Sequence, residues 1–202
     1  YGTVDVVVNN AGANTKKDKV TDINLDDLRY MFELNCVSAL GVIKEFYPVM
    51  KEKQSGLFVN ILSSCCLFHN SMTGSYTASK DAMEAICKIL LKEVKSDHIG
   101  VCNVYPGGVD TNFRSNANAN YLRPETVAKM IKMCIENEDG CVHDIVIRPF
   151  IEDNIAPIIA MENGAITELG EEKSRQMLSA TEQYLKLLQE SYEESNFCAE
   201  GV

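Results

Sequence analysis

The apolar residues of this chain fall into two kinds of segment, which predict strands and helices in alternation. Short runs rich in β-branched residues predict strands at 4–9, 57–62, 99–105 and 142–147. Longer stretches, in which apolar residues recur with helical spacing, predict helices at 25–47, at 73–95 and after Pro124. Strand alternating with helix is typical of a parallel β-sheet covered by helices, so the predicted fold class is α/β.

The boundaries of the first long helix can be predicted from individual residues. Asn24 stands directly before the first apolar position and is able to cap the helix. We expect the helix to end near Pro48, because proline disrupts a helix interior. The Gln, Ser and Gly residues at 54–56 then predict a turn before the second strand.

The chain divides into two predicted parts, at 1–160 and at 161–202. The second part is acidic, and its apolar residues form a stripe at helical spacing: Met177, Ala180, Tyr184, Leu188 and Tyr192. This pattern predicts a helical extension that packs on the first part or on a partner subunit.

Composition and charge exclude several classes of function. Hydrophobic residues make up 46% of the 202 positions and charged residues 24%, as in ordinary soluble domains. A net charge of −10 argues against binding to nucleic acid or to an anionic membrane surface. The sequence contains no apolar run long enough to span a bilayer. We therefore expect a cytoplasmic protein with neither nucleic acid nor membrane as a partner.

Eight cysteines raise the question of disulfides or of a metal site. We expect them to form no metal site, because we identify no CxxC pair and no nearby His at ligand spacing. Several lie inside apolar strand or helix segments, where a free Cys behaves as a small hydrophobic residue. We expect reduced thiols and no metal ligands.

Tyr76 and Lys80 are the most informative pair of polar residues. Four residues apart on a predicted helix, they share one face. A neighbouring cation favours the phenolate form of a Tyr, which suits that Tyr to proton transfer at an alcohol or carbonyl oxygen. Taken alone, the pair proves little, because Tyr and Lys meet by chance at this spacing on many surface helices.

Polar clusters also follow the predicted strands, at the edge where parallel sheets bind ligands. Residues 9–12 let a flat ligand approach the backbone, or form a tight turn. Ser63 and its neighbour Ser64 are placed to bind a substrate oxygen or to cap a turn. Asn35, in mid-helix, needs hydrogen-bond partners if it is buried, and either caps a kink or anchors a water. Residues 106–111 by themselves indicate a turn.

Together these clusters resemble the short-chain dehydrogenase/reductase family. The match rests on motifs in the same order and with the same spacing: NNAG at 9–12, Asn35, NILS at 60–63, YTASK at 76–80 and PGGVDT at 106–111. It covers residues 1 to about 150. The resemblance implies a Rossmann-like, doubly wound parallel sheet and an NAD- or NADP-dependent oxidoreductase that interconverts a carbonyl and an alcohol.

The resemblance also implies a role for each residue of a catalytic tetrad. Tyr76 is expected to exchange the proton with the substrate oxygen, and Lys80 to favour its phenolate and to bind the nicotinamide ribose. Ser63, with Ser64 as the fallback, is expected to hold the substrate oxygen, and Asn35 to position a water. Further residues are expected to line the cofactor: Asn10, Ala11, Gly12, Pro106, Gly107, Val109 and Thr111.

The Gly-rich TGxxxGxG turn, on which family members seat the pyrophosphate, has no counterpart in these 202 residues. The first strand corresponds to the family's fourth, so we expect the chain to lack the first three βα units and to show little or no activity alone. The alternative is a truncated, non-catalytic member that acts as an interaction protein. By resemblance, the helices at 25–47 and 73–95 pair across a subunit interface, which implies a homodimer or homotetramer.

Overall fold

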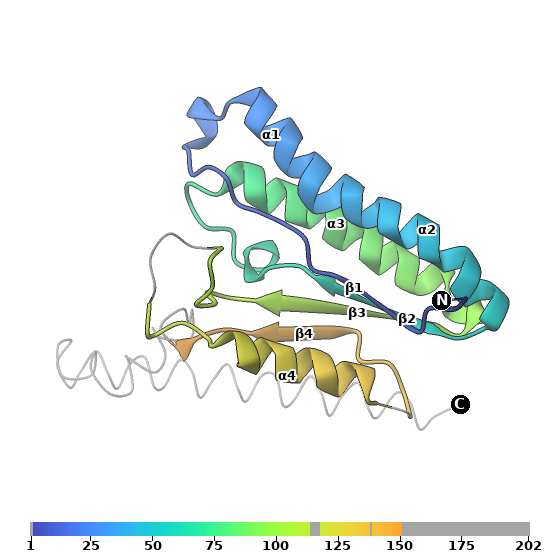
Figure 1. The fold of residues 1–202 in the computed structure, drawn as a ribbon. Coiled ribbons are helices and arrows are strands. Elements are labelled where there is room, and N and C mark those ends of the chain that lie inside the picture. Colours follow the sequence, from blue (N-terminus) through green and yellow to red (C-terminus); the bar gives the residue numbers. More distant parts are fainter. Residues whose placement is uncertain (1, 114–117, 138, 151–202) are drawn as a thin grey trace, which may run out of the picture. The chain divides into compact units, whose positions relative to one another are not determined.

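The structure, a computed structural model, describes residues 2–113, 118–137 and 139–150 (Figure 1). The predicted acidic extension at 161–202 lies outside the described residues, and so does part of the loop that follows Thr111.

Four parallel strands form one sheet, as the sequence predicts. They are β1 (Val6–Asn9), β2 (Gly56–Ile61), β3 (Ile99–Pro106) and β4 (Asp144–Ile147). Their spatial order follows the chain order, β1-β2-β3-β4. Because all strands run the same way, their carboxyl ends meet along a single edge of the sheet.

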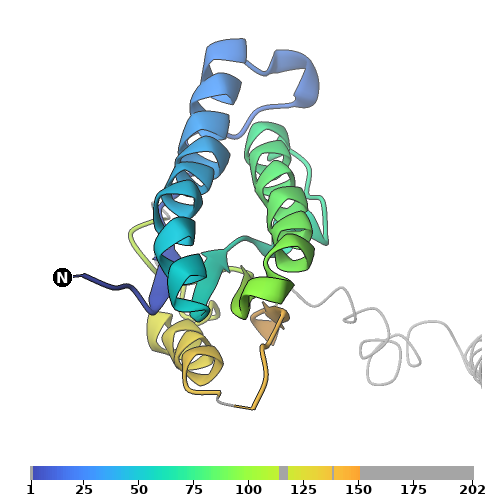
Figure 2. The ribbon, with the colours of Figure 1, turned by 90° about the vertical axis from the view of Figure 1, so that its right-hand side faces the viewer.

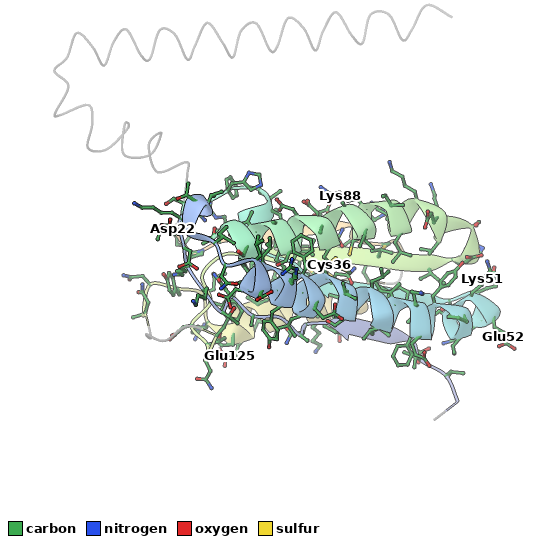
Figure 3. The ribbon with its side chains drawn as sticks, turned by 90° about the horizontal axis from the view of Figure 1, so that it is seen from above. Asp22, Cys36, Lys51, Glu52, Lys88 and Glu125 are labelled. Carbon is green, nitrogen blue, oxygen red and sulfur yellow. The ribbon has the colours of Figure 1, made fainter. Side chains whose placement is uncertain are left out.

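Helices cover both faces of this sheet (Figure 2). On one face lie α1 (Leu25–Phe32), α2 (Ser38–Lys53) and α3 (Gly74–Glu93). On the other face lies α4 (Pro124–Ile135), which begins with its Pro at the first helical position. Seen from above, the α1–α2 segment and α3 run side by side (Figure 3).

The hydrophobic core is divided by the sheet into two layers, because successive side chains of a strand point to opposite faces. Phe58 and Tyr105 pack in the layer beneath α2 and α3. Val59, Cys102 and Val104 pack in the other layer, with Val127 and Cys134 of α4. The described cysteines are free, and all of them except Cys141 are buried, in agreement with their prediction as core residues.

The helix predicted at 25–47 differs from the prediction in two ways. Asn24 caps it as expected, since its side chain accepts a hydrogen bond of 2.7 Å from the backbone N–H of Asp26. The helix then widens into one π-helical turn, η2 (Glu33–Val37), before α2 continues. The expected end near Pro48 is wrong, because α2 continues to Lys53.

The sheet explains why α2 continues beyond its proline. Pro48 removes a single backbone hydrogen bond near the end of the helix. Two residues later, the side chain of Met50 is fully buried in the core beneath α2. Gln54, in the left-handed conformation with φ of 55°, ends the helix instead.

Among the described residues, the short helix η3 (Ser64–Cys66) follows β2 near the carboxyl edge of the sheet, and η4 (Lys95–Asp97) lies between α3 and β3. Another short helix, η1 (Val20–Asp22), precedes α1. Within the described ranges, no helix has the length and apolar character needed to cross a membrane.

Candidate active site

The carboxyl ends of the strands open onto a cavity of about 1320 Å³. This volume exceeds the roughly 300–1000 Å³ of common small-molecule pockets. Most residues predicted to form the site line it: Asn10, Gly12, Ser63, Ser64, Tyr76, Lys80, Pro106, Gly107, Val109 and Thr111. Two do not, since Asn35 lies behind the wall and Ala11 is absent from the lining.

Lys80 has its ammonium held at the base of this cavity. The residue is 5% exposed, and its Nζ donates a hydrogen bond of 2.8 Å to the carbonyl oxygen of Ile61, the last residue of β2. Burial lowers the pKa of Lys80 below its usual value, because desolvation penalises the charged form. The cation is therefore fixed in place at the cavity wall.

Tyr76 lies one helical turn before Lys80 on the same helix, α3, and lines the same cavity. Its ring packs against that of Phe113, with centroids 6.0 Å apart and planes tilted by 57°. Phe113 carries no sequence signal of a site residue, since it stands in a polar loop.

Ser63 ends the extended segment that follows β2. Its hydroxyl oxygen accepts a hydrogen bond of 3.2 Å from the backbone N–H of Cys65 and so caps η3. Ser63 thus caps a turn and also lines the cavity, so both roles considered from the sequence stay open to it. Ser64 lines the cavity as well, although it is buried.

Asn35 stands in the π-helical turn and is 1% exposed. Its side chain accepts a hydrogen bond from the backbone N–H of Ala13 and donates one to the carbonyl oxygen of Ala13, each of 2.9 Å. It donates another, also 2.9 Å, to Ser79, whose hydroxyl donates to the Tyr76 carbonyl over 2.7 Å. Asn35 therefore joins the loop after β1 to the helix that carries Tyr76 and Lys80.

Gly12 occupies a position that has no room for a side chain. A Cβ placed there would lie 2.8 Å from Asn35 Oδ1 and 3.2 Å from Lys80 Nζ. The chain therefore passes close to the buried amide and the buried ammonium, and a flat ligand is able to approach its backbone.

The cavity wall fits a nicotinamide nucleotide in two further respects. Asn14 Oδ1 is buried at this wall without a hydrogen-bond partner among the described residues, so an acceptor is available for a ligand hydroxyl or amide. The turn at Pro106, Gly107 and Val109 adds backbone and apolar surface on the other side. Asn14 was missed from the sequence because it follows the NNAG motif rather than belonging to it.

A row of polar side chains crosses the sheet beside the site. Asn9 donates to Asn60 over 2.9 Å, Asn60 to Asn103 over 3.3 Å, and Asn103 to Asp144 over 3.1 Å. These four residues are register partners on successive strands. The row satisfies polar groups that would otherwise destabilise a buried sheet, and it fixes the relative position of the strand ends.

The row continues into the layer beneath α3. Tyr105 approaches Asp144 at 3.1 Å and Glu84 at 3.0 Å. Burial raises the pKa of the Tyr105 hydroxyl far above its usual value, and the two carboxylates add to this effect. Tyr105 is thus a structural hydrogen-bond donor and is unsuited to acid–base chemistry near neutral pH.

Comparisons with known proteins agree with this arrangement. A family model described as short chain dehydrogenase matches residues 1–122. An uncharacterized oxidoreductase of Staphylococcus aureus is 29% identical over 153 residues, which cover 74% of this chain and 66% of that relative. Dehydrogenase/reductase SDR family member 7 of Mus musculus is 31% identical over 118 residues, 58% of this chain and 35% of its own.

Solved structures share the fold. A short-chain dehydrogenase from Streptomyces avermitilis has a TM-score of 0.67 at 26% identity, with 88% of this chain and 72% of that chain covered. An alcohol dehydrogenase from Thermococcus sibiricus, complexed with 5-hydroxy-NADP, has a TM-score of 0.69 at 23% identity, with 76% and 66% covered. Among the relatives compared by sequence, the region that this chain matches makes up about two thirds of the length of the Staphylococcus aureus oxidoreductase.

Proposed function

The chain belongs to the short chain dehydrogenase family, and on that premise we propose that the protein is an NAD- or NADP-dependent oxidoreductase acting on a small carbonyl or alcohol substrate. One observation carries the proposal: Tyr76 and the buried Lys80 face one cavity at the carboxyl edge of the sheet. The solved neighbour complexed with 5-hydroxy-NADP supports the cofactor class.

In this proposal the cofactor supplies or accepts the hydride when it is bound. The residues that would hold its nicotinamide end are Asn10, Gly12, Lys80, Pro106, Gly107, Val109 and Thr111. Ala11 belongs to the same motif, but it does not line the cavity, so only its backbone is proposed to shape the turn.

The proton chemistry falls to Tyr76. Reduction of a carbonyl places negative charge on its oxygen, and the Tyr76 and Ser63 hydroxyls are proposed to donate hydrogen bonds where that charge develops. Lys80, held by Ile61, contributes the positive charge that favours the phenolate when the reaction runs toward the carbonyl.

Asn35 supports the loop after β1 and the helix α3 from behind the cavity wall. It does not line the cavity, and its bonds to Ala13 and Ser79 are proposed to keep the NNAG loop and α3 at a fixed distance. Asn35 is therefore proposed as a positioning residue, and the water-positioning role that the family resemblance implies stays a prediction.

The test is a nicotinamide assay on the longest natural form of the protein. NADH and NADPH oxidation is followed at 25 °C with a panel of aldehydes and ketones, for the unmutated protein and for Tyr76→Phe. Loss of a positioned acid–base group is expected to lower the rate by about 10²–10⁴-fold. Tyr30→Phe, an exposed Tyr on α1, is the matched control and is expected to keep full activity.

Two results would overturn the proposal. One is the absence of oxidation with every substrate of the panel, which would favour the non-catalytic interaction protein. The other is an activity that Tyr76→Phe leaves unchanged. The 202 residues alone are expected to show little or no turnover, because they contain no TGxxxGxG turn.

A homodimer or homotetramer is part of the same proposal. The helices expected to pair between subunits carry exposed apolar side chains, among them Val42 on α2 and Ile89 on α3. Sedimentation velocity of the longest natural form should give a dimer or a tetramer, and a monomer at micromolar concentration would exclude this assembly.

A further inference from the structure

Three potential metal ligands converge on the side of α3 next to the cavity. They are Cys66 of η3 and Asp81 and Glu84 of α3, and their ligand atoms all lie within 4.8 Å of one another. Cys66 is buried, whereas the two carboxylates are partly buried. The group lies outside the set of residues that line the cavity.

Asp81 shows that the local bonding is incomplete. Its Oδ1 atom is buried and has no hydrogen-bond partner within the part of the chain that the structure describes, although the side chain as a whole is 37% exposed. Its other oxygen, Oδ2, lies 3.2 Å from His69 Nε2. A buried acceptor without a donor is destabilising, and a bound cation would satisfy it.

We propose that Cys66, Asp81 and Glu84 bind a divalent transition metal ion of the zinc class. The ring nitrogens of His69 lie outside this group of ligand atoms, but Nε2 already contacts Asp81, and a rotation of the exposed His69 side chain would bring it in as the fourth ligand. The set combines sulfur, oxygen and nitrogen donors, a combination that suits Zn²⁺ and disfavours Mg²⁺ and Ca²⁺. Ligands of a tetrahedral zinc ion lie roughly 3–4 Å apart, so small side-chain rotations close the observed group around an ion.

The spacing in sequence agrees with this geometry. Cys66 and His69 are three residues apart, and so are Asp81 and Glu84 on one face of α3. The expectation of no metal ligands rested on the absence of a CxxC pair and of a His at ligand spacing, so it overlooked the Cys66–His69 spacing and did not consider the two carboxylates of a helix. The fold brings Cys66 next to Asp81 and Glu84.

Glu84 Oε1 already has two partners, the Tyr105 hydroxyl at 3.0 Å and the Lys88 ammonium, so a metal ion would bind the other carboxylate oxygen or displace Lys88. Lys80 lies near the group as well. Lys88 pairs with Glu84 Oε1 at 2.5 Å, but its side chain is 51% exposed and can turn into solvent (Figure 3). Lys80, which follows Tyr76 by one turn, is tied to Ile61. A thiolate and two carboxylates bring three negative charges, so a divalent ion is accommodated even with these lysines close by.

Metal binding would have a structural consequence. Cys66 lies three residues after Ser63, and Asp81 directly follows Lys80. The ion would join η3 to α3 and so hold the Ser63 turn against the helix that carries Tyr76. This inference does not depend on the proposed oxidoreductase activity, because binding is measured without substrate or cofactor.

The test is metal binding by the full-length protein. After chelator treatment the protein is titrated with Zn²⁺ alone by isothermal calorimetry and with Co²⁺ alone by visible absorption. One ion per chain is expected, with a sulfur-to-cobalt charge-transfer band. Cys66→Ser and Asp81→Asn should each weaken binding by more than the 10–100-fold that loss of an outer-shell partner costs, and Cys66→Ser should remove the band.

Matched controls separate this site from other thiols and acids. Cys134→Ser changes a buried thiol of α4 on the other face of the sheet, and Glu93→Gln changes another carboxylate of α3. Both should bind one Zn²⁺ with unchanged affinity. Circular dichroism is recorded for every variant, so that unfolding is recognised.

X-ray absorption of the unmutated, zinc-loaded protein makes the test independent of the variants. One sulfur at about 2.3 Å and nitrogen or oxygen ligands at about 2.0–2.2 Å are expected. The proposal fails if no stoichiometric ion binds, if the spectrum contains no sulfur ligand, or if folded Cys66→Ser keeps the affinity of the unmutated protein.

Discussion

The ammonium of Lys80 donates a hydrogen bond of 2.8 Å to the carbonyl oxygen of Ile61, so the middle of α3 is tied to the end of β2. Helical spacing alone places Tyr76 and Lys80 on one face of a helix. The bond to Ile61 shows that this face is turned toward the carboxyl edge of the sheet, which is where a Rossmann-like fold binds its ligand.

Lys80 should make the stability of the protein depend on pH in a specific direction. Burial lowers its pKa, so between this lowered pKa and the ordinary lysine pKa of 10.5 the unfolded chain binds more protons than the folded one. In that window the stability of the unmutated protein should rise with pH relative to Lys80→Met, by at most about 1.4 kcal/mol per pH unit.

Urea unfolding of both proteins from pH 7 to 10.5 measures this difference. Lys92→Met, an exposed lysine of the same helix, is the control and should show no such trend. A stability difference between the unmutated protein and Lys80→Met that stays constant across this range would contradict the prediction.

Gly12 should not tolerate even a methyl group. In Gly12→Ala the new Cβ meets Asn35 Oδ1 at 2.8 Å and Lys80 Nζ at 3.2 Å, so the buried contacts must shift. A loss of about 1–3 kcal/mol in the free energy of unfolding is expected. Gly41→Ala, where the added Cβ meets nothing within 4 Å in the interior of α2, should instead stabilise the protein by about 0.5–1 kcal/mol.

Denaturant unfolding distinguishes the two glycine variants, because the free energy of unfolding should fall for Gly12→Ala and rise for Gly41→Ala. If Gly12→Ala is as stable as the unmutated protein, Gly12 does not lie as close to the Asn35 amide and the Lys80 ammonium as the structure indicates.

Asn60 should be the most sensitive member of the polar row. Its replacement by Ala leaves the donor of Asn9 and the acceptor of Asn103 without their partner. Each buried unsatisfied group costs about 1–3 kcal/mol, so a total loss of about 2–4 kcal/mol is expected in urea unfolding. Asn112→Ala, at an exposed position, is the control and should change stability by less than about 0.5 kcal/mol. If Asn60→Ala and Asn112→Ala have equal effects, the polar row does not stabilise the sheet.

Asn35 should require an amide rather than a carboxylate. Asn35→Asp keeps an acceptor for the Ala13 N–H, but it loses the donor to the Ala13 carbonyl and places a negative charge against that oxygen. We expect a loss of about 2–4 kcal/mol, against about 1 kcal/mol for Ser79→Ala, which removes one hydrogen-bond partner. Thermal unfolding at pH 7 compares the stability of the two variants. The prediction is contradicted if Asn35→Asp is more stable than Ser79→Ala.

Much of the fold could be predicted because it depends on local pattern. Apolar runs mark all four strands, and Asn24 caps the first helix as its position indicates. The end of α2 could not be predicted from Pro48, because the burial of Met50 against the sheet outweighs a local preference. The π-helical turn around Asn35 likewise has no local signal, since it depends on partners more than twenty residues away.

The residues of the candidate site also fall into those that the sequence predicts and those that it does not. Ser63, Tyr76 and Lys80 were identified from motifs that keep their spacing along the chain, and the structure places all three around one cavity. The polar row was not identified, since Asn103 and Asp144 become partners only through strand register. Ala11 belongs to the motif but is not part of the cavity lining.

The sequence by itself determined which segments become strands and helices and which residues share a helical face, because both follow from the periodicity of the backbone. The tertiary structure alone decided which distant side chains meet. Asn35 with Ala13, Lys80 with Ile61, and Cys66 with Asp81 and Glu84 are contacts between separate elements. Such contacts depend on how the layers pack, which no local pattern encodes.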